Sequence, residues 1–187
     1  MRDWPVGFDG IAETVTVTPD PGDTWNVAAL GVRAGDPATA RTWGATNTRR
    51  NLERAGAAVV TFGRDPLLFV EAALTEVHRP DPVPETADAW ARVEATAIGR
   101  GESGETGWVD WALEPTESTV ERRTVPVTNR GTNAVIEMTV AASRLGVPTY
   151  DDGTLRDRLS YFEDVVETCG GEREMAALER LRDTVEW

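Results

Sequence analysis

The order of apolar and polar residues predicts strands through most of the chain. Residues 13–18 alternate valine with threonine, which is typical of a half-buried strand. Residues 24–33 are mostly apolar, as expected for a strand buried on both faces. The same reasoning predicts strands over residues 57–62, 90–98, 108–114 and 119–127, with a glycine-rich turn over residues 99–107. Short strands with hairpin-like connections favour a closed or partly open antiparallel barrel over a parallel sheet.

Two helices are predicted between these strands. The polar stretch 41–48 runs into a helix over residues 49–55, which ends at Gly56. Asp65 and Pro66 then form a favourable helix start. Aspartate accepts hydrogen bonds from free backbone amides there, and proline has no amide hydrogen to leave unpaired.

The last part of the chain is predicted to be helical. Residues 128–133 open a helix that reaches Leu145, and beyond residue 150 apolar residues recur at helical spacing on both sides of Gly170–Gly171. We therefore predict a mainly β fold with helices (α+β). A barrel domain would cover residues 1–150, and an αα-hairpin would be appended over residues 151–187.

Charge indicates the environment in which the protein works. The chain has 32 acidic and 19 basic residues, a net charge of −13, and every basic residue is arginine. An acidic, lysine-free surface is typical of a halophilic cytoplasm, where molar salt shortens the Debye length to about 3 Å. The alternative is a GC-rich genome that disfavours lysine codons, which does not explain the net charge. A general nucleic-acid binder is excluded, because that role requires a basic face.

Several classes of site are not expected. No apolar run approaches the length of about 18 residues that a membrane span needs, and the first ten residues lack a secretion signal. The single cysteine, Cys169, excludes an internal disulfide and a cysteine-based zinc site. The single histidine, His78, accompanies no nucleophile pattern and is expected to be an exposed loop residue. We predict no metal site and identify no catalytic residue.

The strongest candidate site is the segment from Arg41 to Asn51. Thr46 and Thr48 stand at a helix entrance, where free backbone amides favour an anion. Residues 41–54 carry four arginines and one glutamate, a local charge of +3 in an acidic chain. Guanidinium groups bind phosphate through paired hydrogen bonds. The alternative is an ordinary capped helix whose arginines pair with nearby acids.

Two further segments are candidates. Residues 128–133 are rich in hydrogen-bond donors and also open a helix; the alternative is a simple helix cap. Asn26 is followed by the small residues of segment 28–31, which would let a flat ring approach the strand backbone. The alternative is a strand packed beneath a helix.

Four blocks occur in a recognisable order: TWNVAALGVR, RTWGATNTRRNLERAGAAVVTF, DPLLFVEAAL and TNRGTNAVIEMTVAASRLGV. Together they resemble the archaeal DUF447 family, which is similar to FMN-binding split-barrel proteins related to flavin reductases. The resemblance covers residues 10–148, and a C-terminal hairpin is typical of the DUF447 branch. It implies a six-stranded antiparallel split β-barrel with peripheral helices, which dimerises and binds FMN near the subunit interface.

The resemblance also implies a set of cofactor-binding residues. The phosphate would lie by the strand-to-helix segment, the ring along the strand from Asn26 to Gly31, and Asn129 and Arg130 would complete the pocket from either subunit. Ala29 departs from the proline that relatives often carry. The implied FMN-binding residues are Asn26, Ala28, Leu30, Gly31, Arg41, Thr46, Asn47, Thr48, Asn51, Asn129 and Arg130.

These expectations support three functions. The first is an FMN-dependent oxidoreductase of unknown substrate, a homodimer reduced by a nicotinamide or a deazaflavin in the cytoplasm. The second is a non-catalytic electron carrier or flavin store. The third is an acidic interaction module without a cofactor. Because FMN carries its own reactive atom, the lack of a catalytic side chain is consistent with the first.

Overall fold

The structure is a computed structural model that describes residues 3–187, and the chain forms two compact units. The first unit comprises the chain up to Gly63 together with Glu76–Thr124, and the second comprises Arg64–Thr75 together with Val125–Trp187. The second unit therefore contains two helices that precede residue 150. The proposed domain boundary at that residue stays a prediction.

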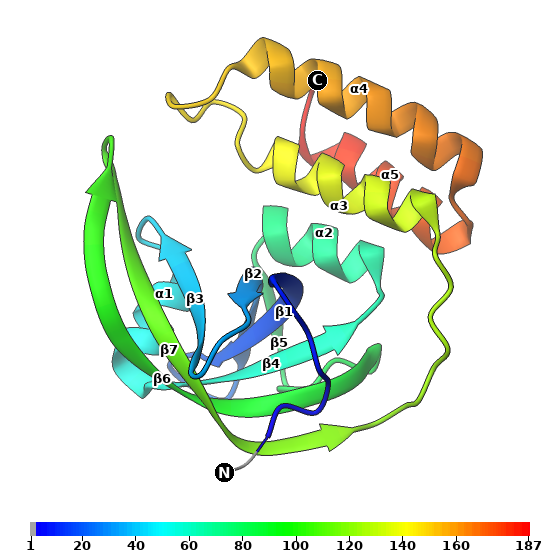
Figure 1. The fold of residues 1–187 in the computed structure, drawn as a ribbon. Helices are drawn as coiled ribbons and strands as arrows, with labels where there is room; N and C mark the ends of the chain where they lie inside the picture. The colour runs from blue at the N-terminus through cyan, green and yellow to red at the C-terminus, as the bar shows by residue number, and fades with distance from the viewer. Residues whose placement is uncertain (1–2) are drawn as a thin grey trace. The chain divides into compact units, whose positions relative to one another are not determined.

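The first unit is a closed antiparallel barrel of six strands with one extra strand (Figure 1). The barrel runs in the order β1-β4-β6-β7-β3-β2, and β2 pairs back with β1 to close it. The strands are β1 Ile11–Pro19, β2 Trp25–Arg33, β3 Ala38–Trp43, β4 Ala57–Gly63, β5 Val77–Arg79, β6 Ala87–Ser103 and β7 Thr106–Val120. This architecture confirms the predicted α+β fold with a six-stranded antiparallel barrel.

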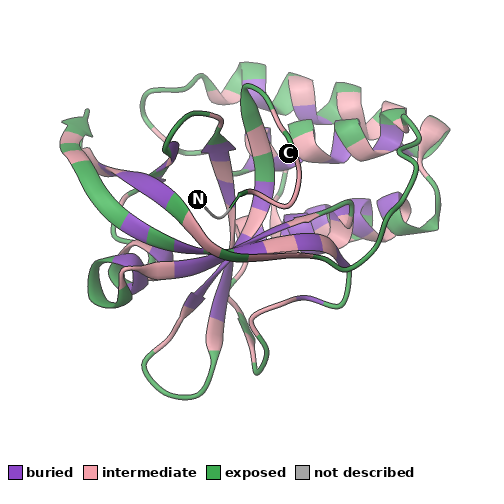
Figure 2. Ribbon diagram, turned by 60° about the horizontal axis from the view of Figure 1, so that its bottom comes forward, coloured by how far each residue is buried: buried purple, intermediate pink, exposed green. Residues whose placement is uncertain are grey.

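Along β6 buried residues alternate with less buried ones from Ala87 to Ala95, whereas β4 is buried at four consecutive positions, 58–61. Figure 2 colours each residue by its burial. The inward positions form a core that includes Leu30, Val60, Val93 and Trp111. Burial of this apolar surface is the main force that holds the barrel together.

Three local predictions were wrong. Segment 41–48 begins with the end of strand β3, so it is not wholly a polar lead into a helix. Strands β6 and β7 continue through most of the predicted turn at 99–107, and the turn that connects them consists of Gly104 and Glu105 alone. Strand β7 is continuous through Pro115, where the pairing with β6 shifts register, and residues 121–127 form no strand.

One edge of β2 is not fully paired. Along the edge that faces away from β1, its first three residues pair with β5, and Val32 and Arg33 pair with β3. Among the described residues, no strand pairs with Ala28–Gly31 on that edge. In an antiparallel strand alternate residues direct both backbone groups to the same side. Two of these four residues therefore direct an N–H and a C=O group into the gap.

Helix α1, Asn47–Ala55, connects β3 to β4 and packs on the barrel. Thr46 is its N-cap, and its side chain accepts a hydrogen bond from the backbone amide of Arg49. The helix ends at Gly56, whose φ of 60° is a left-handed conformation that glycine adopts without strain. The predicted end of this helix is confirmed, and its start lies two residues earlier than expected.

The second unit consists of four helices around a core of its own. They are α2 Pro66–Leu74, α3 Arg130–Ala142, α4 Asp152–Cys169 and α5 Glu172–Thr184. Asp65 caps α2 by accepting a hydrogen bond from the backbone amide of Leu68, and Pro66 follows, as predicted. Helices α4 and α5 form the expected hairpin about the Gly170–Gly171 connection.

The start of α3 contacts the connection between α4 and α5. A Cβ added at Gly131 would lie 2.6 Å from the Cα of Gly170, so the two backbones touch. Beside this contact the hydroxyl of Thr132 donates to Glu174 Oε1 over 2.6 Å, and the backbone amide of Gly171 donates to Glu174 Oε2 over 3.0 Å. Glu174, which is buried, thus joins the starts of α3 and α5.

Replacing Glu174 by glutamine should weaken the second unit and change its response to acid. Burial disfavours the charged carboxylate, but hydrogen bonds from Thr132 and from the backbone amides of Glu174 and Gly171 outweigh burial and lower the pKa of Glu174 below its ordinary value. A lowered pKa in the folded state stabilises the protein above the unfolded-state pKa of about 4.3, and this stabilisation is lost as pH falls through the lower folded value. We expect E174Q to cost about 1–3 kcal/mol at pH 7.

Urea unfolding followed by circular dichroism between pH 3 and pH 7 measures this effect. E174Q should show a smaller loss of stability than the wild type as pH falls. Glu179→Gln, which changes an exposed residue of the same helix, is the control and should behave as the wild type. An unchanged acid dependence in E174Q would contradict the role given to this carboxylate.

Candidate functional site

A buried network of polar side chains joins β1, β2 and the start of α1. The side-chain amide of Asn26 donates to Thr48 Oγ1 over 3.1 Å and to Thr18 Oγ1 over 3.4 Å. The amide of Asn51 also donates to Thr18 Oγ1, over 3.2 Å. All four residues are buried, with exposures of 0–5 %. The structure thus brings together three predicted cofactor-binding residues, Asn26, Thr48 and Asn51.

The network continues to the surface through Asp20. Its Oδ1 accepts a hydrogen bond from the Asn51 side-chain amide over 2.8 Å, and its Oδ2 lies 2.6 Å from His78 Nδ1. His78 occupies this position because β5 pairs with β2 and sets it opposite Asn26. His78 is exposed, as expected, but it belongs to a strand and not to a loop.

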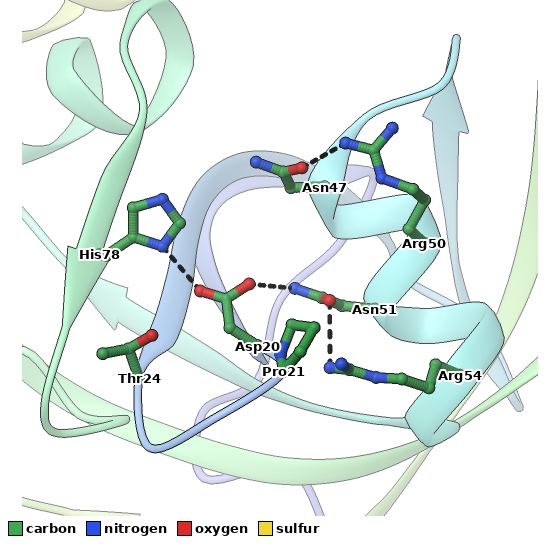
Figure 3. Close-up of a pocket in the computed structure, with 8 residues that line it drawn as sticks. All are labelled: Asp20, Pro21, Thr24, Asn47, Arg50, Asn51, Arg54 and His78. Carbon is green, nitrogen blue, oxygen red and sulfur yellow. Dashed lines mark hydrogen bonds and ion pairs between the residues drawn. The ribbon is translucent and has the colours of Figure 1, made fainter.

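A pocket with a volume of about 410 Å³ opens beside this network (Figure 3). Its lining comes from the β1–β2 turn, from one face of α1 and from β5. The lining residues are Asp20, Pro21, Thr24, Asn47, Arg50, Asn51, Arg54 and His78. The volume lies within the usual range of about 300–1,000 Å³ for small-molecule sites.

The start of α1 offers hydrogen-bond donors to an anion. Thr46 Oγ1 accepts from the amide of Arg49 over 3.2 Å, and the carbonyl of Thr46 accepts from the amide of Arg50. Within residues 3–187, the backbone amides of Asn47 and Thr48 have no acceptor. Free amides at a helix start carry partial positive charge and favour a negative ligand.

Arg41 is bound elsewhere on the barrel. Its Nε and Nη2 donate to the two carboxylate oxygens of Asp110 over 2.6 and 2.8 Å, and its guanidinium lies 4.0 Å from the ring centroid of Trp108. The hydrogen bond from Arg41 lowers the pKa of Asp110, and the same bond raises the pKa of Arg41. Arg41 does not line the pocket. Its predicted contact with phosphate stays a prediction.

The remaining predicted residues fall into two places. Ala28, Leu30 and Gly31 lie on the unpaired part of β2; Leu30 reaches into the core and the other two are half-buried. Asn129 and Arg130 belong to the second unit, where Asn129 caps α3 by accepting a hydrogen bond from the Gly131 amide.

Sequence reasoning missed part of the pocket lining, including Asp20, Thr24 and Arg54. One signal was present: Asn47, Arg50 and Arg54 are spaced by three and four residues, which places them on one face of a helix. The β1–β2 turn and β5 reach the pocket only through strand pairing, so no local sequence pattern predicts that they line it.

Within residues 3–187, no helix is both long and apolar enough to cross a membrane. The same residues bring together no three His, Cys, Asp or Glu side chains that could hold a metal ion.

The closed six-stranded barrel, with a gap in the pairing of β2, places this protein in the split-barrel class. Its family follows from the sequence: residues 12–122 match the model described as protein of unknown function (DUF447) N-terminal domain, and residues 129–183 match the model described as protein of unknown function (DUF447). The chain belongs to the DUF447 family.

Solved structures agree with this assignment. The crystal structure of an FMN-bound DUF447 protein from Methanosarcina mazei is 23% identical, covers 95% of this chain and 96% of that chain, and superposes with a TM-score of 0.80. An FMN-binding protein from Thermus thermophilus with bound p-hydroxybenzaldehyde is 15% identical and covers 65% of this chain and 82% of that chain, with a TM-score of 0.44. Flavoredoxin from Methanosarcina acetivorans is 11% identical and covers 67% of this chain and 79% of that chain, with a TM-score of 0.45.

The TM-score of 0.80 shows that this chain and the Methanosarcina mazei protein share a fold. No protein with a curated description matches the chain in sequence.

Proposed function

We propose that this chain binds FMN and acts as a flavin-dependent oxidoreductase. The observation that carries the proposal is the gap in the pairing of β2 at Ala28–Gly31, which lies next to Asn26 and the start of α1. Membership of the DUF447 family supports it, because the Methanosarcina mazei member is FMN-bound.

The gap fits a flat heteroaromatic ring. Two residues of the segment direct an N–H and a C=O group outward, which matches the donors and acceptors on the polar edge of a flavin. Ala28, Ala29 and Gly31 have small side chains or none, so a ring can approach the backbone closely. Alanine in place of the relatives' proline at position 29 leaves one more backbone amide on this strand.

The start of α1 fits the phosphate end of FMN. The amides of Asn47 and Thr48 are free, and the Thr46 hydroxyl is exposed beside them. The buried bond from Asn26 to Thr48 fixes this helix start against β2, 22 residues earlier in the chain. The ring and the phosphate would therefore be held at a set separation.

FMN supplies hydride and electron transfer through its ring, so the protein need only bind it, orient it and control access. The chain's own residues would do this with the β2 backbone and the α1 amides. We propose a reduced nicotinamide or a deazaflavin as electron donor. The second candidate is an electron carrier or flavin store, favoured by the lack of an assigned catalytic side chain.

The proposal also covers the oligomeric state of the protein and the cellular environment in which it works. We propose a homodimer in which Asn129 and Arg130, from either subunit, complete the FMN site. The net charge of −13 and the absence of lysine support a halophilic cytoplasm.

Absorption spectroscopy tests the cofactor. The protein purified in high salt, or reconstituted with FMN, should show the two visible flavin bands, and Thr46→Ala with Thr48→Ala should remove most of the bound flavin. Asp151→Ala, which removes the cap of α4, is the matched control and should retain it. A wild-type protein that stays colourless after reconstitution would contradict the proposal, and full flavin retention in the double variant would contradict the phosphate placement.

Anaerobic mixing with donors separates the two candidate functions. If the protein is an oxidoreductase, a reduced nicotinamide or deazaflavin should bleach the bound flavin within seconds. A flavin that no donor of either class reduces would instead support the electron carrier or flavin store.

A further inference from the structure

The pocket beside α1 holds two arginines whose charge is not neutralised by the protein. Arg50 Nη1 donates to the carbonyl of Ala45 over 2.8 Å, and its Nη2 donates to Asn47 Oδ1. Arg54 Nη2 donates to Asn51 Oδ1 over 3.1 Å and to the carbonyl of Pro19. All four acceptors are neutral, and within residues 3–187 neither guanidinium forms an ion pair.

This arrangement is unexpected in so acidic a chain. Carboxylates outnumber guanidinium groups by 32 to 19, and on the same helix Arg49 forms an ion pair with Glu53. Arg50 and Arg54 are also four residues apart, where two like charges on a helix repel each other. Two uncompensated, mutually repelling cations beside one pocket indicate a site for an anion.

The arginines are oriented as well as charged. A guanidinium has five N–H donors, and the contacts to neutral oxygens occupy two N–H groups of Arg50. These contacts to neutral oxygens hold the Arg50 side chain without neutralising its charge, and both Arg50 and Arg54 line the pocket. Directed bonds of this kind matter in molar salt, which screens a bare positive patch.

The one carboxylate that lines the pocket is already occupied. Asp20 accepts from the Asn51 amide and contacts His78 Nδ1, as Figure 3 shows. With two arginines and one aspartate, the lining has a net charge of +1 when His78 is neutral. Thr24 and Asn47 add uncharged polar groups to the same lining.

We propose that this pocket is a phosphate-binding site, with Arg50 and Arg54 as the charged ligands of the phosphate oxygens. Phosphate has the chemistry that fits, because its several acceptor oxygens can be shared between two guanidinium groups. The phosphate has two possible sources: the tail of the proposed flavin, or a separate phosphorylated molecule. The proposal stands without the flavin, since it follows from the pocket and its charges alone.

Calorimetric titration of the full chain with inorganic phosphate, FMN and riboflavin tests the site and its source. The test variant is Arg50→Gln with Arg54→Gln. The control is Arg92→Gln with Arg100→Gln, which removes the same charge from two exposed, ion-paired residues of β6. We expect the test variant to bind at least one phosphate-bearing probe roughly tenfold more weakly than the control, because it loses charge-assisted hydrogen bonds.

The three probes distinguish the outcomes. Weaker binding of FMN with unchanged binding of riboflavin identifies the flavin tail as the source. Weaker binding of inorganic phosphate with unchanged binding of FMN identifies a separate ligand. A wild-type protein that binds phosphate but neither flavin would contradict the proposed function and leave the phosphate site standing. Equal affinities of the test and control variants for both inorganic phosphate and FMN would overturn the site.

Discussion

Gly131→Ala is expected to lower the stability of the second unit by about 3 kcal/mol, at the upper end of the usual cost of overpacking. The added Cβ would lie 2.6 Å from the Cα and 2.8 Å from the nitrogen of Gly170. These are backbone atoms and cannot rotate away. Gly170 is itself held in place, because its backbone amide donates to the carbonyl oxygen of Val166 over 2.7 Å. The start of α3 would have to withdraw from the α4–α5 connection and break the Thr132–Glu174 hydrogen bond.

Urea unfolding followed by helical circular dichroism measures this loss. Gly153→Ala is the matched control: it lies in α4, is exposed, and its Cβ would meet only Asp151 Oδ1, at 3.4 Å. Alanine is favoured over glycine within helices by up to about 1 kcal/mol, so this variant should be as stable as the wild type or slightly more stable. If Gly131→Ala unfolds at the wild-type midpoint, the close backbone contact is not required.

Asn26→Leu is expected to destabilise the barrel by about 2–3 kcal/mol. The substitution keeps the number and branching of the side-chain heavy atoms but removes both hydrogen bonds that Asn26 donates, to Thr48 and Thr18. Thr18 retains a bond from Asn51, whereas Thr48 loses the donor that binds its hydroxyl oxygen. Leaving a buried polar group without its partner costs about 1–3 kcal/mol.

Tryptophan fluorescence during urea unfolding reports on this change, because six of the seven tryptophans lie in the first unit. Thr61→Val is the matched control in the same barrel. It also makes a buried polar residue apolar, but it removes a single hydrogen bond, to the carbonyl of Val15. We expect a cost of about 1 kcal/mol or less for the control. An equal cost for the two variants would show that the network adds nothing beyond one hydrogen bond.

Local patterns were sufficient to predict much of the fold. Strand β2 is mostly apolar, and Asp65 with Pro66 marks the start of α2 by side-chain chemistry alone. Strand β3 was missed because its inward residues, Ala38, Ala40 and Thr42, are small or polar and contrast little with their outward neighbours. The predicted turn at 99–107 was too long, because the prediction treated its glycines as turn residues. Gly101 instead lies within β6, where a Cβ would overlap the ring of Trp108.

Predicting the site from sequence requires more knowledge of long-range strand pairing than predicting the fold does. Thr46, Thr48 and Asn51 could be grouped from sequence because they share one helix start. His78 could not be placed with them, since its position depends on the pairing of a three-residue strand with β2. The ion pair of Arg41 joins residues 69 positions apart, which only the β3–β7 register reveals.

The shortness of the gap in β2 limits what can attach there. An exposed strand edge commonly invites a strand from another polypeptide, which is a route to aggregation. Here the opening is four residues long and is bounded by β5 at one end and β3 at the other. A typical strand has about five or six residues, so a foreign strand would collide with these neighbours before it could form a full ladder. The length of the gap therefore works against polymerisation through this edge, even though its backbone groups have no strand partner.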